Sequence, residues 1–161
     1  MFSDAHHSSL GTRYNPLKKM SIEKTLCIIK PDAVTAGNSG NIIAHIQKEG
    51  FRILAMRMTT LSNKSASKFY EIHKGRPFYE GLVEFMSSSA CVPIALEKEN
   101  AIAEWRRVIG ATDPAEAAPG TIRKLYAKNK GETAVHGSDS VENGLREIAF
   151  FFTEGELEDL N

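Results

Sequence analysis

Short runs of strand-forming residues alternate with helical patterns along this chain, and that alternation limits its fold more than any other feature. Residues 24–30 (KTLCIIK) form an apolar run rich in β-formers, which Pro31 ends. Residues 51–60 form a second strand pattern with apolar side chains on both faces, and two more apolar runs cover 90–96 and 134–135. Strands interleaved with helices predict an α/β or α+β fold of two layers, with a four-stranded sheet covered by helices on one face.

Amphipathic patterns predict the helices between and after these strands. They cover residues 39–49, 62–74, 77–87, 99–109, 121–128 and 139–150. For the last of them, Asp139 or Ser138 is the expected cap, and Glu142 lies three residues after Asp139 as in a capping box. The acidic tail from Glu154 to Asn161 is expected to be frayed.

The length of 161 residues fits one domain with a real core, and neither a repeat nor a linker divides the chain. Residues 1–20 are polar and lack the apolar stretch of a secretory signal. We therefore expect a flexible N-terminal extension over 1–20, or a true start at Met20, followed by a single domain over 21–161. Cys27 and Cys91 each lie in an apolar run, which is typical of reduced core thiols rather than of a disulfide or a metal pair.

Charge and hydropathy exclude some classes of partner. Lysine plus arginine number 20 and aspartate plus glutamate number 20, so the net charge gives no argument for a nucleic-acid or membrane partner. No apolar stretch approaches the roughly 18 residues of a membrane span. The expected location is the cytoplasm, and any polyanionic ligand must be bound by positive charge that the fold gathers locally.

His136 is the sharpest candidate for chemistry. It is followed by Gly-Ser-Asp-Ser, so no bulky neighbour shields it, and Gly137 permits backbone conformations that other residues avoid. Neutral imidazole is a good nucleophile near pH 7, and its bond to phosphorus is labile enough to pass the group on. Such a carrier needs a partner on its other ring nitrogen. Glu147 in the last predicted helix could reach back to supply it, with a hydrogen bond from Ser138, although a histidine in a loop is more often a surface residue.

Three cationic side chains could form a phosphate clamp. Lys30 ends the first predicted strand, and Arg106 and Arg123 lie on either side of the connection 110–120. As isolated residues, each is more often a solvated surface charge. Phe78, just after Arg76-Pro77, would usually pack in a core, but if exposed it could stack on a nucleobase.

Other phosphate-binding and metal-binding patterns are missing. Residues 37–40 (GNSG) precede a predicted helix but lack the GxxxxGK[ST] and GxGxxG patterns, so we interpret them as a turn. No pair of His or Cys has the spacing of zinc ligands, and His45 and His73 are interpreted as structural residues of helices.

Five motifs taken together resemble nucleoside diphosphate kinase. They are KPD at 30–32, RPF at 76–78, GATDP at 110–114, PGTIR at 119–123 and HGSDS at 136–140. Each motif alone is weak, but their order and spacing match the family from about Ile22 to Phe152. The resemblance implies a four-stranded antiparallel sheet of ferredoxin-like βαββαβ topology covered by helices, an α+β sandwich, with a helix pair inserted over 62–87. It also implies transfer of the γ-phosphoryl group, mainly from ATP, to a nucleoside diphosphate by a ping-pong mechanism.

The resemblance also implies roles for single residues. His136 would be phosphorylated on Nδ1, with support from Ser138, Glu147 and Tyr70. Phe78 would stack on the base. The other nucleotide-binding residues would be Lys30, Arg106, Thr112 and Arg123, where the family spacing to Gly110 selects Arg106 over Arg107.

No side chain is expected to bind the metal directly. Mg²⁺ would be bound by the nucleotide's own phosphates and by water, with Asp139 nearby. The partners implied are nucleoside tri- and diphosphates and further copies of the chain in a tetramer or hexamer, between which the sequence does not decide.

One position departs from the family pattern. Three residues before the histidine, family members usually carry Asn, which contacts the sugar and phosphates, and this chain has Thr133. A hydroxyl is shorter than an amide, so the departure predicts a loss of about 1 kcal/mol in nucleotide binding without loss of activity.

Two other functions compete with the kinase. A phosphocarrier or phosphatase would need a base beside His136 that positions water, and the sequence offers no obvious candidate. A nonenzymatic nucleotide-binding or regulatory module on the same fold could be expected to lose the histidine or the clamp. Here His136, Lys30, Arg106 and Arg123 are all present, which favours the enzyme.

Overall fold

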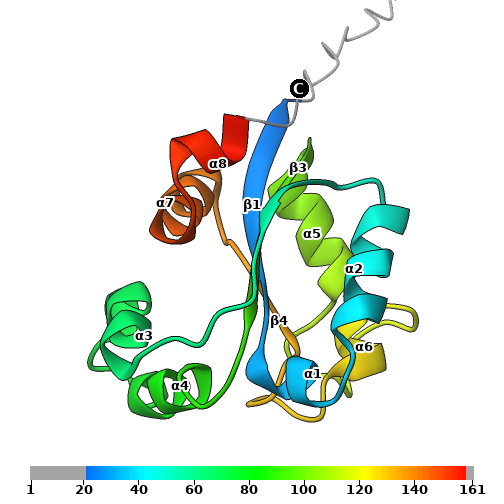
Figure 1. Cartoon of the computed structure of the whole chain (residues 1–161). Helices are drawn as coiled ribbons and strands as arrows, with labels where there is room; N and C mark the ends of the chain where they lie inside the picture. The colour runs from blue at the N-terminus through cyan, green and yellow to red at the C-terminus, as the bar shows by residue number, and fades with distance from the viewer. Residues whose placement is uncertain (1–20, 159–161) are drawn as a thin grey trace, which may run out of the picture.

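The structure is a computed structural model that describes residues 21–158. Its elements run in the order shown in Figure 1. They are β1 Ile22–Ile29, α1 Pro31–Thr35, α2 Ser39–Lys48, β2 Arg52–Met56, α3 Asn63–Phe69, the 3₁₀ helix η1 Glu71–His73, α4 Tyr79–Met86, β3 Val92–Glu99, α5 Ala101–Ile109, α6 Ile122–Tyr126, β4 Val135–Gly137, α7 Val141–Phe151 and α8 Glu154–Glu158.

The four strands form one antiparallel sheet in the order β2-β3-β1-β4. β1 lies at the centre and pairs with β3 along its whole length, from Ile22 opposite Glu99 to Ile29 opposite Val92. On its other side β1 pairs with the short β4, where Ile28 faces His136 across the ladder. This confirms the predicted ferredoxin-like sheet, with α3, η1 and α4 as the inserted helical segment between β2 and β3.

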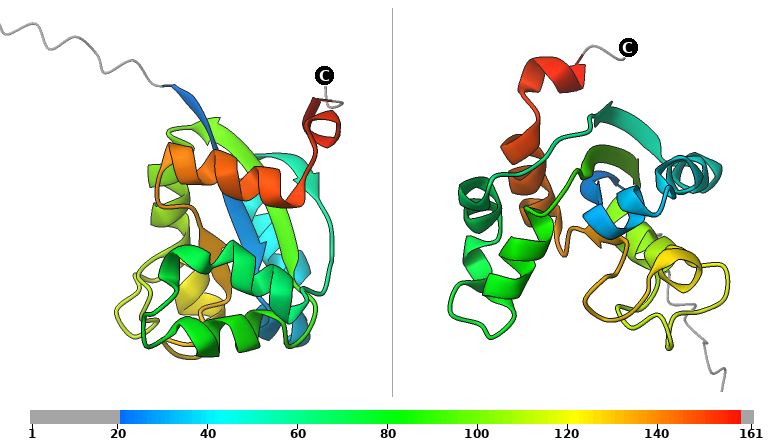
Figure 2. Two further views of the ribbon diagram at one scale, coloured as in Figure 1. Left: turned by 90° about the vertical axis from the view of Figure 1, so that its left-hand side faces the viewer. Right: turned by 60° about the horizontal axis from the view of Figure 1, so that its bottom comes forward.

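Helices cover both faces of the sheet, so the prediction that they cover one face is wrong. Cys27 and Ile29 of β1 point into a cluster with residues of α2, α5 and α6. Leu26 and Ile28 point the other way, into a cluster with residues of α3, α4 and α7. The two helical layers are visible on opposite sides of the strands in Figure 2. The physical reason is the continuous apolar run of β1, because a strand that is apolar on both faces has to be buried on both.

Several boundaries differ from the sequence-based expectation. β2 ends at Met56, and of the remaining predicted strand only Thr59 makes an isolated bridge, to Cys91. The last long helix is capped by Ser140, whose side chain accepts a hydrogen bond from the backbone N–H of Asn143 at 3.1 Å, and not by Asp139 or Ser138. Of the acidic tail that was predicted to be frayed, Glu154–Glu158 form α8, and residues 159–161 lie outside the described residues.

Cys27 and Cys91 are buried free thiols, as expected, and burial raises the pKa of the Cys91 thiol to about 11. Within residues 21–158, no helix is long and apolar enough to cross a membrane. The extension predicted over 1–20 lies outside the described residues.

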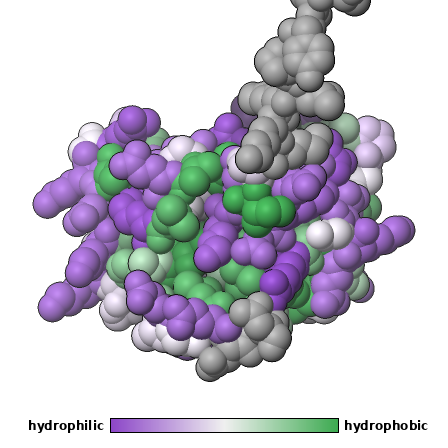
Figure 3. Space-filling view, turned by 90° about the horizontal axis from the view of Figure 1, so that it is seen from above, coloured by the Kyte–Doolittle hydropathy of each residue, from purple (hydrophilic) through white to green (hydrophobic). Residues whose placement is uncertain are grey.

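Segments far apart in the sequence meet at the lower edge of the molecule in Figure 1. There the end of β1 and α1 lie near α4, α6 and the start of β4. On the opposite face, seen from above in Figure 3, apolar side chains gather in a hollow among polar ones. At this edge the short β4, which carries His136, pairs with the end of the central strand β1.

Candidate active site

His136 lies in β4, not in a loop as predicted, and its side chain is 19% exposed. Its Nε2 lies 2.6 Å from Oε1 of Glu147, which is buried on α7. The hydroxyl of Ser138 donates to the same carboxylate oxygen at 2.9 Å and accepts a hydrogen bond from the backbone N–H of Leu26 at 3.0 Å. The structure thus brings His136, Ser138 and Glu147 together and ties them to β1.

This arrangement decides which ring nitrogen is available for chemistry. Because a carboxylate only accepts, the neutral imidazole of His136 donates its Nε2–H to Glu147 and keeps a lone pair on Nδ1. A positive charge that develops on the ring is stabilised by the buried carboxylate. The ring is also packed edge-to-face against Phe69, with the centroids 5.8 Å apart.

Two glycines allow the close packing that produces this geometry. A Cβ on Gly137 would lie 2.9 Å from Cδ1 of Trp105, so only glycine leaves room for the indole, whose Nε1 donates to the carbonyl of His136 at 3.1 Å. Gly137 is therefore needed for space and not for the backbone freedom that we predicted. A Cβ on Gly144 would lie 2.8 Å from the carbonyl oxygen of Lys24, and glycine there lets α7 approach β1 one turn before Glu147.

Lys30 and Arg123 form a partly buried pair of cations. The Lys30 ammonium donates to the hydroxyl of Thr133 at 2.9 Å. Burial, with a contribution from Arg123, lowers the pKa of Lys30 to about 8, while Asp32 acts in the opposite sense. Arg123 donates to the carbonyls of Gly110, Val135 and Thr133 at 3.2, 3.1 and 3.4 Å, and burial and then Arg106 lower its pKa. Lys30 and Arg123 thus place two positive charges near the one carboxylate of Asp32, and an excess of positive charge in a partly buried site favours a polyanionic ligand.

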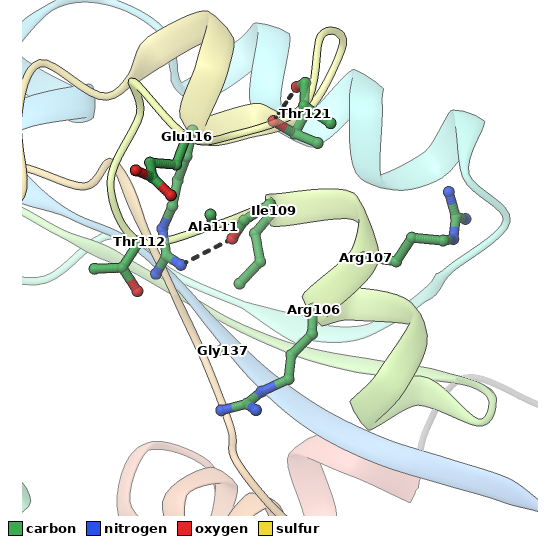
Figure 4. A pocket seen from close by; sticks show the side chains of 11 residues that line it. Arg106, Arg107, Ile109, Ala111, Thr112, Glu116, Thr121 and Gly137 are labelled. Carbon is green, nitrogen blue, oxygen red and sulfur yellow. Dashed lines mark hydrogen bonds between the residues drawn. The ribbon is translucent and has the colours of Figure 1, made fainter.

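Arg106 and Arg107 follow each other on α5 but point to different sides (Figure 4). Arg106 is directed toward the strand that carries Gly137. Arg107 points away from it and is bonded to Glu104 at 2.7 Å and to Glu49 at 3.1 Å. Of these two arginines, Arg107 is paired with carboxylates, and Arg106, the one chosen from the sequence, is directed toward β4.

Two cavities adjoin each other along this edge. One of about 600 Å³ lies between α5 and the connection 110–120, and Figure 4 shows the side chains that line it. The other, of about 620 Å³, lies between the inserted helices and the segment 130–133. Thr112 and Arg123 line both cavities. The first cavity is also lined by Arg106 and Gly137, and the second by Lys30, Phe78 and Thr133. Together the two cavities can bind an elongated ligand with an anionic end.

The second cavity has an aromatic wall at its mouth. Phe78 precedes α4 and is 49% exposed, so it is not part of the core. The ring of His73 lies 5.3 Å behind it. Tyr70 is buried and lines neither cavity, and its hydroxyl has no hydrogen-bond partner within residues 21–158. Burial, together with the charges of Cys91 and Glu147, raises the pKa of that hydroxyl.

Asp139 is exposed after β4 and accepts a hydrogen bond from the side chain of Asn143 at 2.6 Å. That bond and, more weakly, Arg106 lower the pKa of Asp139, so the carboxylate is ionised. The described residues contain no group of three or more His, Cys, Asp or Glu that could ligate a metal ion. A single carboxylate, that of Asp139, is too few ligands for a metal ion bound by the protein alone. It suits a metal ion that is bound mainly by an anionic ligand.

Sequence reasoning left out three residues that the structure places at the site. Thr133 was set aside, yet it is buried against Lys30. Asp32 was only part of a motif, yet its Oδ2 accepts a hydrogen bond from the backbone N–H of Ala134 at 3.0 Å. His73 was interpreted as structural, yet its ring contacts Phe78 and its Nδ1 is buried without a partner in the described part of the chain. Asp32 carried a sequence signal, its place beside Lys30, and Thr133 carried another, its departure from the family's Asn, whereas His73 carried none.

Comparison with known proteins gives a consistent result. A family model described as "Nucleoside diphosphate kinase" matches residues 23–157. A nucleoside diphosphate kinase of Chloroherpeton thalassium is 61% identical over 135 residues, which cover 84% of this chain and 96% of that protein. The solved nucleoside diphosphate kinase of Aquifex aeolicus has a TM-score of 0.84 at 44% identity and covers 85% of this chain and 99% of its own. That of Halobacterium salinarum, solved in complex with CDP, has a TM-score of 0.82 at 34% identity, with 88% and 94% covered.

Proposed function

This chain belongs to the nucleoside diphosphate kinase family, and from that premise we propose how its own residues perform the family's reaction. The chain is an enzyme that transfers a phosphoryl group from a nucleoside triphosphate to a nucleoside diphosphate by a ping-pong mechanism through phosphohistidine. We assign the phosphohistidine to His136. The observation that carries this assignment is the 2.6 Å contact between His136 Nε2 and Glu147, which leaves Nδ1 as the nucleophile.

The phosphates bind to the cationic side chains that the two cavities share or adjoin. Arg123 and Thr112 lie where the cavities meet and contact the phosphates in the middle of the ligand. Arg106 lies on the side of β4 and neutralises charge on the phosphoryl group that is transferred. Lys30 contributes its ammonium from the end of β1.

The transfer step needs little covalent chemistry from the protein. The Nδ1 lone pair of His136 attacks the γ-phosphorus, the bond between that phosphorus and the bridging oxygen breaks, and the diphosphate leaves with the electron pair. The proton on Nε2 stays with the ring, and the Glu147 carboxylate stabilises the cationic phosphoimidazole. A second nucleoside diphosphate enters the same site and takes the group by the reverse path.

The base lies against Phe78 at the mouth of the second cavity. Stacking on a half-exposed aromatic ring uses the π-face that every base has, and it makes few contacts with base edges. We therefore propose broad tolerance for the base, with ATP as the main donor. Tyr70 and Ser138 support the site from beneath, Tyr70 through packing against Phe69 at 4.7 Å and Ser138 through Glu147.

Family members use a divalent metal, and we propose Mg²⁺ bound through the nucleotide's phosphates. When bound, it neutralises phosphate charge and orients the triphosphate. The ionised Asp139 lies on the side of Arg106, where it can interact with water around such an ion. A single domain over 21–161, assembly into a tetramer or hexamer, and a cytoplasmic location also stay proposals; light scattering and cell fractionation would test the last two.

The test is phosphoryl labelling of the intact protein with ATP that carries a labelled γ-phosphate, followed by a chase with GDP. We expect an acid-labile, base-stable label that moves to GDP, and no label in His136→Asn. His45→Asn is the matched control, because His45 lies on α2 within 3.8 Å of Glu49 and away from both cavities. Label that passes only to water would indicate a phosphatase, and an unlabelled wild-type protein would indicate a nonenzymatic nucleotide-binding module.

A further inference from the structure

The backbone just before His136 is strained. Ala134 has φ of +67°, and in the described part of the chain it is one of two non-glycine residues with positive φ. The backbone N–H of Val135 donates to the carbonyl of Thr133 at 2.7 Å, so residues 133–135 form a tight three-residue γ-turn centred on Ala134. An L-residue adopts this conformation only where the surrounding structure enforces it.

Asp32 supplies one of the two contacts that enforce the turn. Its Oδ2 accepts the backbone N–H of Ala134 at 3.0 Å, and the backbone N–H of Lys30 donates to the carbonyl of Ala134 at 2.8 Å. The peptide groups on both sides of Ala134 are thus bound by the segment in which β1 passes into α1. The other oxygen of Asp32, Oδ1, is buried without a hydrogen-bond partner within residues 21–158. A buried carboxylate that is only half satisfied is costly, and its presence calls for a reason beyond packing.

The turn contacts two cations of the proposed site, Lys30 and Arg123, and leads directly into His136. Thr133 at its start accepts the hydrogen bond of Lys30 at 2.9 Å. The carbonyls of Thr133 and Val135 accept hydrogen bonds from Arg123. His136 follows directly after Val135 in β4. A small rotation at Ala134 would therefore move Thr133, the acceptors of Arg123 and the imidazole at the same time.

We propose that Asp32 is a positioning residue for phosphoryl transfer, whose buried carboxylate holds the γ-turn at Ala134 and keeps an anion beside the Lys30 ammonium. The carboxylate does not touch the nucleotide. It acts through the turn on Thr133 and His136, and through its charge on Lys30. This inference rests on the proposed site, because it assigns Asp32 to the same His136 and Lys30.

The charges around Lys30 give the proposal a second readout. Arg123 from α6 opposes protonation of Lys30 and Asp32 from α1 favours it. Lys130 and Glu132 line the same cavity from the segment before β4. Of these groups, Asp32 is the anion that contributes to the Lys30 pKa. Removing its charge lets Lys30 lose its proton at lower pH, which moves the alkaline fall of kcat/KM to lower pH.

Three variants of the full chain test the proposal through steady-state kinetics and the rate of His136 labelling. Asp32→Ala loses both the turn contact and the charge, and we expect kcat to fall about tenfold or more, since small misplacement of reacting groups has effects of that size. Asp32→Asn keeps an oxygen that can accept from Ala134. We expect its kcat at pH 7 to stay within about threefold of wild type while its alkaline fall in kcat/KM moves to lower pH.

The third variant asks whether the strained turn is the link. Glycine adopts positive φ without strain, so Ala134→Gly in the Asp32→Ala background should recover about threefold or more of the lost kcat. Thr25→Val is the control for damage to the core: Thr25 is fully buried on β1 with an unpartnered hydroxyl, and its replacement should change the melting temperature but not kcat per folded molecule.

The proposal is overturned if Asp32→Ala keeps the wild-type kcat. It is also overturned if Ala134→Gly does not recover the kcat lost in Asp32→Ala and the pH profile of Asp32→Asn is unchanged. Should Asp32→Ala fail to fold, the pH profile of Asp32→Asn decides alone. Wild-type protein that takes no label from ATP would instead contradict the proposed function, so the two failures are distinguishable.

Discussion

The segments before and after His136 are held in place by different kinds of contact. On the C-terminal side, Ser138 and Glu147 form a buried side-chain network, with hydrogen bonds of 2.6 to 3.0 Å that end on the backbone of β1. On the N-terminal side, Thr133 and Ala134 are placed by a strained turn that costs about 1–3 kcal/mol and persists because Asp32 and Lys30 bind its peptide groups.

Under the proposed mechanism, this difference gives the two segments different parts in the reaction. The C-terminal segment fixes the tautomer of His136 and meets the positive charge that forms on it. The N-terminal segment sets the environment of the cations that receive the nucleotide's negative charge. Damage on the C-terminal side should therefore slow the chemical step with little change in KM. Loss of the contacts of Lys30 and Thr133 should mainly weaken nucleotide binding, whereas loss of the turn itself should also slow the chemical step, because it displaces His136.

The largest effect is expected at Glu147. In Glu147→Gln the amide can donate to Nε2, which favours the tautomer that has its proton on Nδ1 and lacks the nucleophilic lone pair. We expect the rate of His136 labelling, measured by rapid quench, to fall about 100-fold with little change in KM. The exposed Glu142 on the same helix provides the control, because Glu142→Gln keeps the buried network intact. A larger change in KM than in the labelling rate would contradict the division of work.

An effect of intermediate size is expected at alkaline pH, where Lys30 loses its proton and kcat/KM falls. Its pKa is lowered to about 8, so the ammonium is present at pH 7 and is lost as pH rises through 8. If the charged form alone binds nucleotide well, kcat/KM at pH 9 should be about tenfold below its plateau. Lys30→Arg replaces the group by one that keeps its proton throughout this range, so its profile should stay flat between pH 7 and 9. A fall of the same size in Lys30→Arg would assign the titration to another group.

The smallest effect is expected at Thr133. Thr133→Val removes the acceptor that Lys30 uses at 2.9 Å. One lost hydrogen bond of about 1 kcal/mol corresponds to a rise of about fivefold in KM, with kcat unchanged. Thr133→Ser retains the hydroxyl and should bind like wild type, and Thr133→Asn tests whether the amide common in the family binds more tightly. Equal KM values in all four proteins would show that this contact does not matter for nucleotide binding.

The two segments also differ in how far the sequence predicts them. On the C-terminal side, the side chains themselves indicate their chemistry. His136 and Ser138 could therefore be named from the HGSDS motif, and Glu147 from its position in the helix that follows. The reason given for Gly137 was wrong, because the need for space arises from Trp105, which lies 31 residues before His136 in the sequence and approaches only in the folded chain. The cap of α7 was also wrong, since Ser138 is used by Glu147 and Ser140 takes its place.

The N-terminal side could not be predicted because its determinants are contacts of backbone groups with residues that lie far away in the sequence. Nothing in the sequence of residues 133–135 (TAV) predicts a positive φ at Ala134, because an alanine in an apolar run is expected to have an ordinary strand conformation. The bond from Ala134 to Asp32 spans 102 positions and exists only because β4 pairs beside β1. The same limit explains the sheet: its four strands were predicted, but periodicity did not show that the apolar run of β1 serves two faces.

Trp105 is the only tryptophan in the sequence, and its buried indole donates to the carbonyl of His136 at 3.1 Å. Indole emission responds to nearby charge. A phosphoryl group on His136 would bring two negative charges to the residue whose carbonyl the indole of Trp105 contacts. The protein consequently carries an optical reporter that is hydrogen-bonded to the proposed phosphorylation site. Each half-reaction can be timed by stopped-flow fluorescence with unlabelled nucleotides and without any change to the chain.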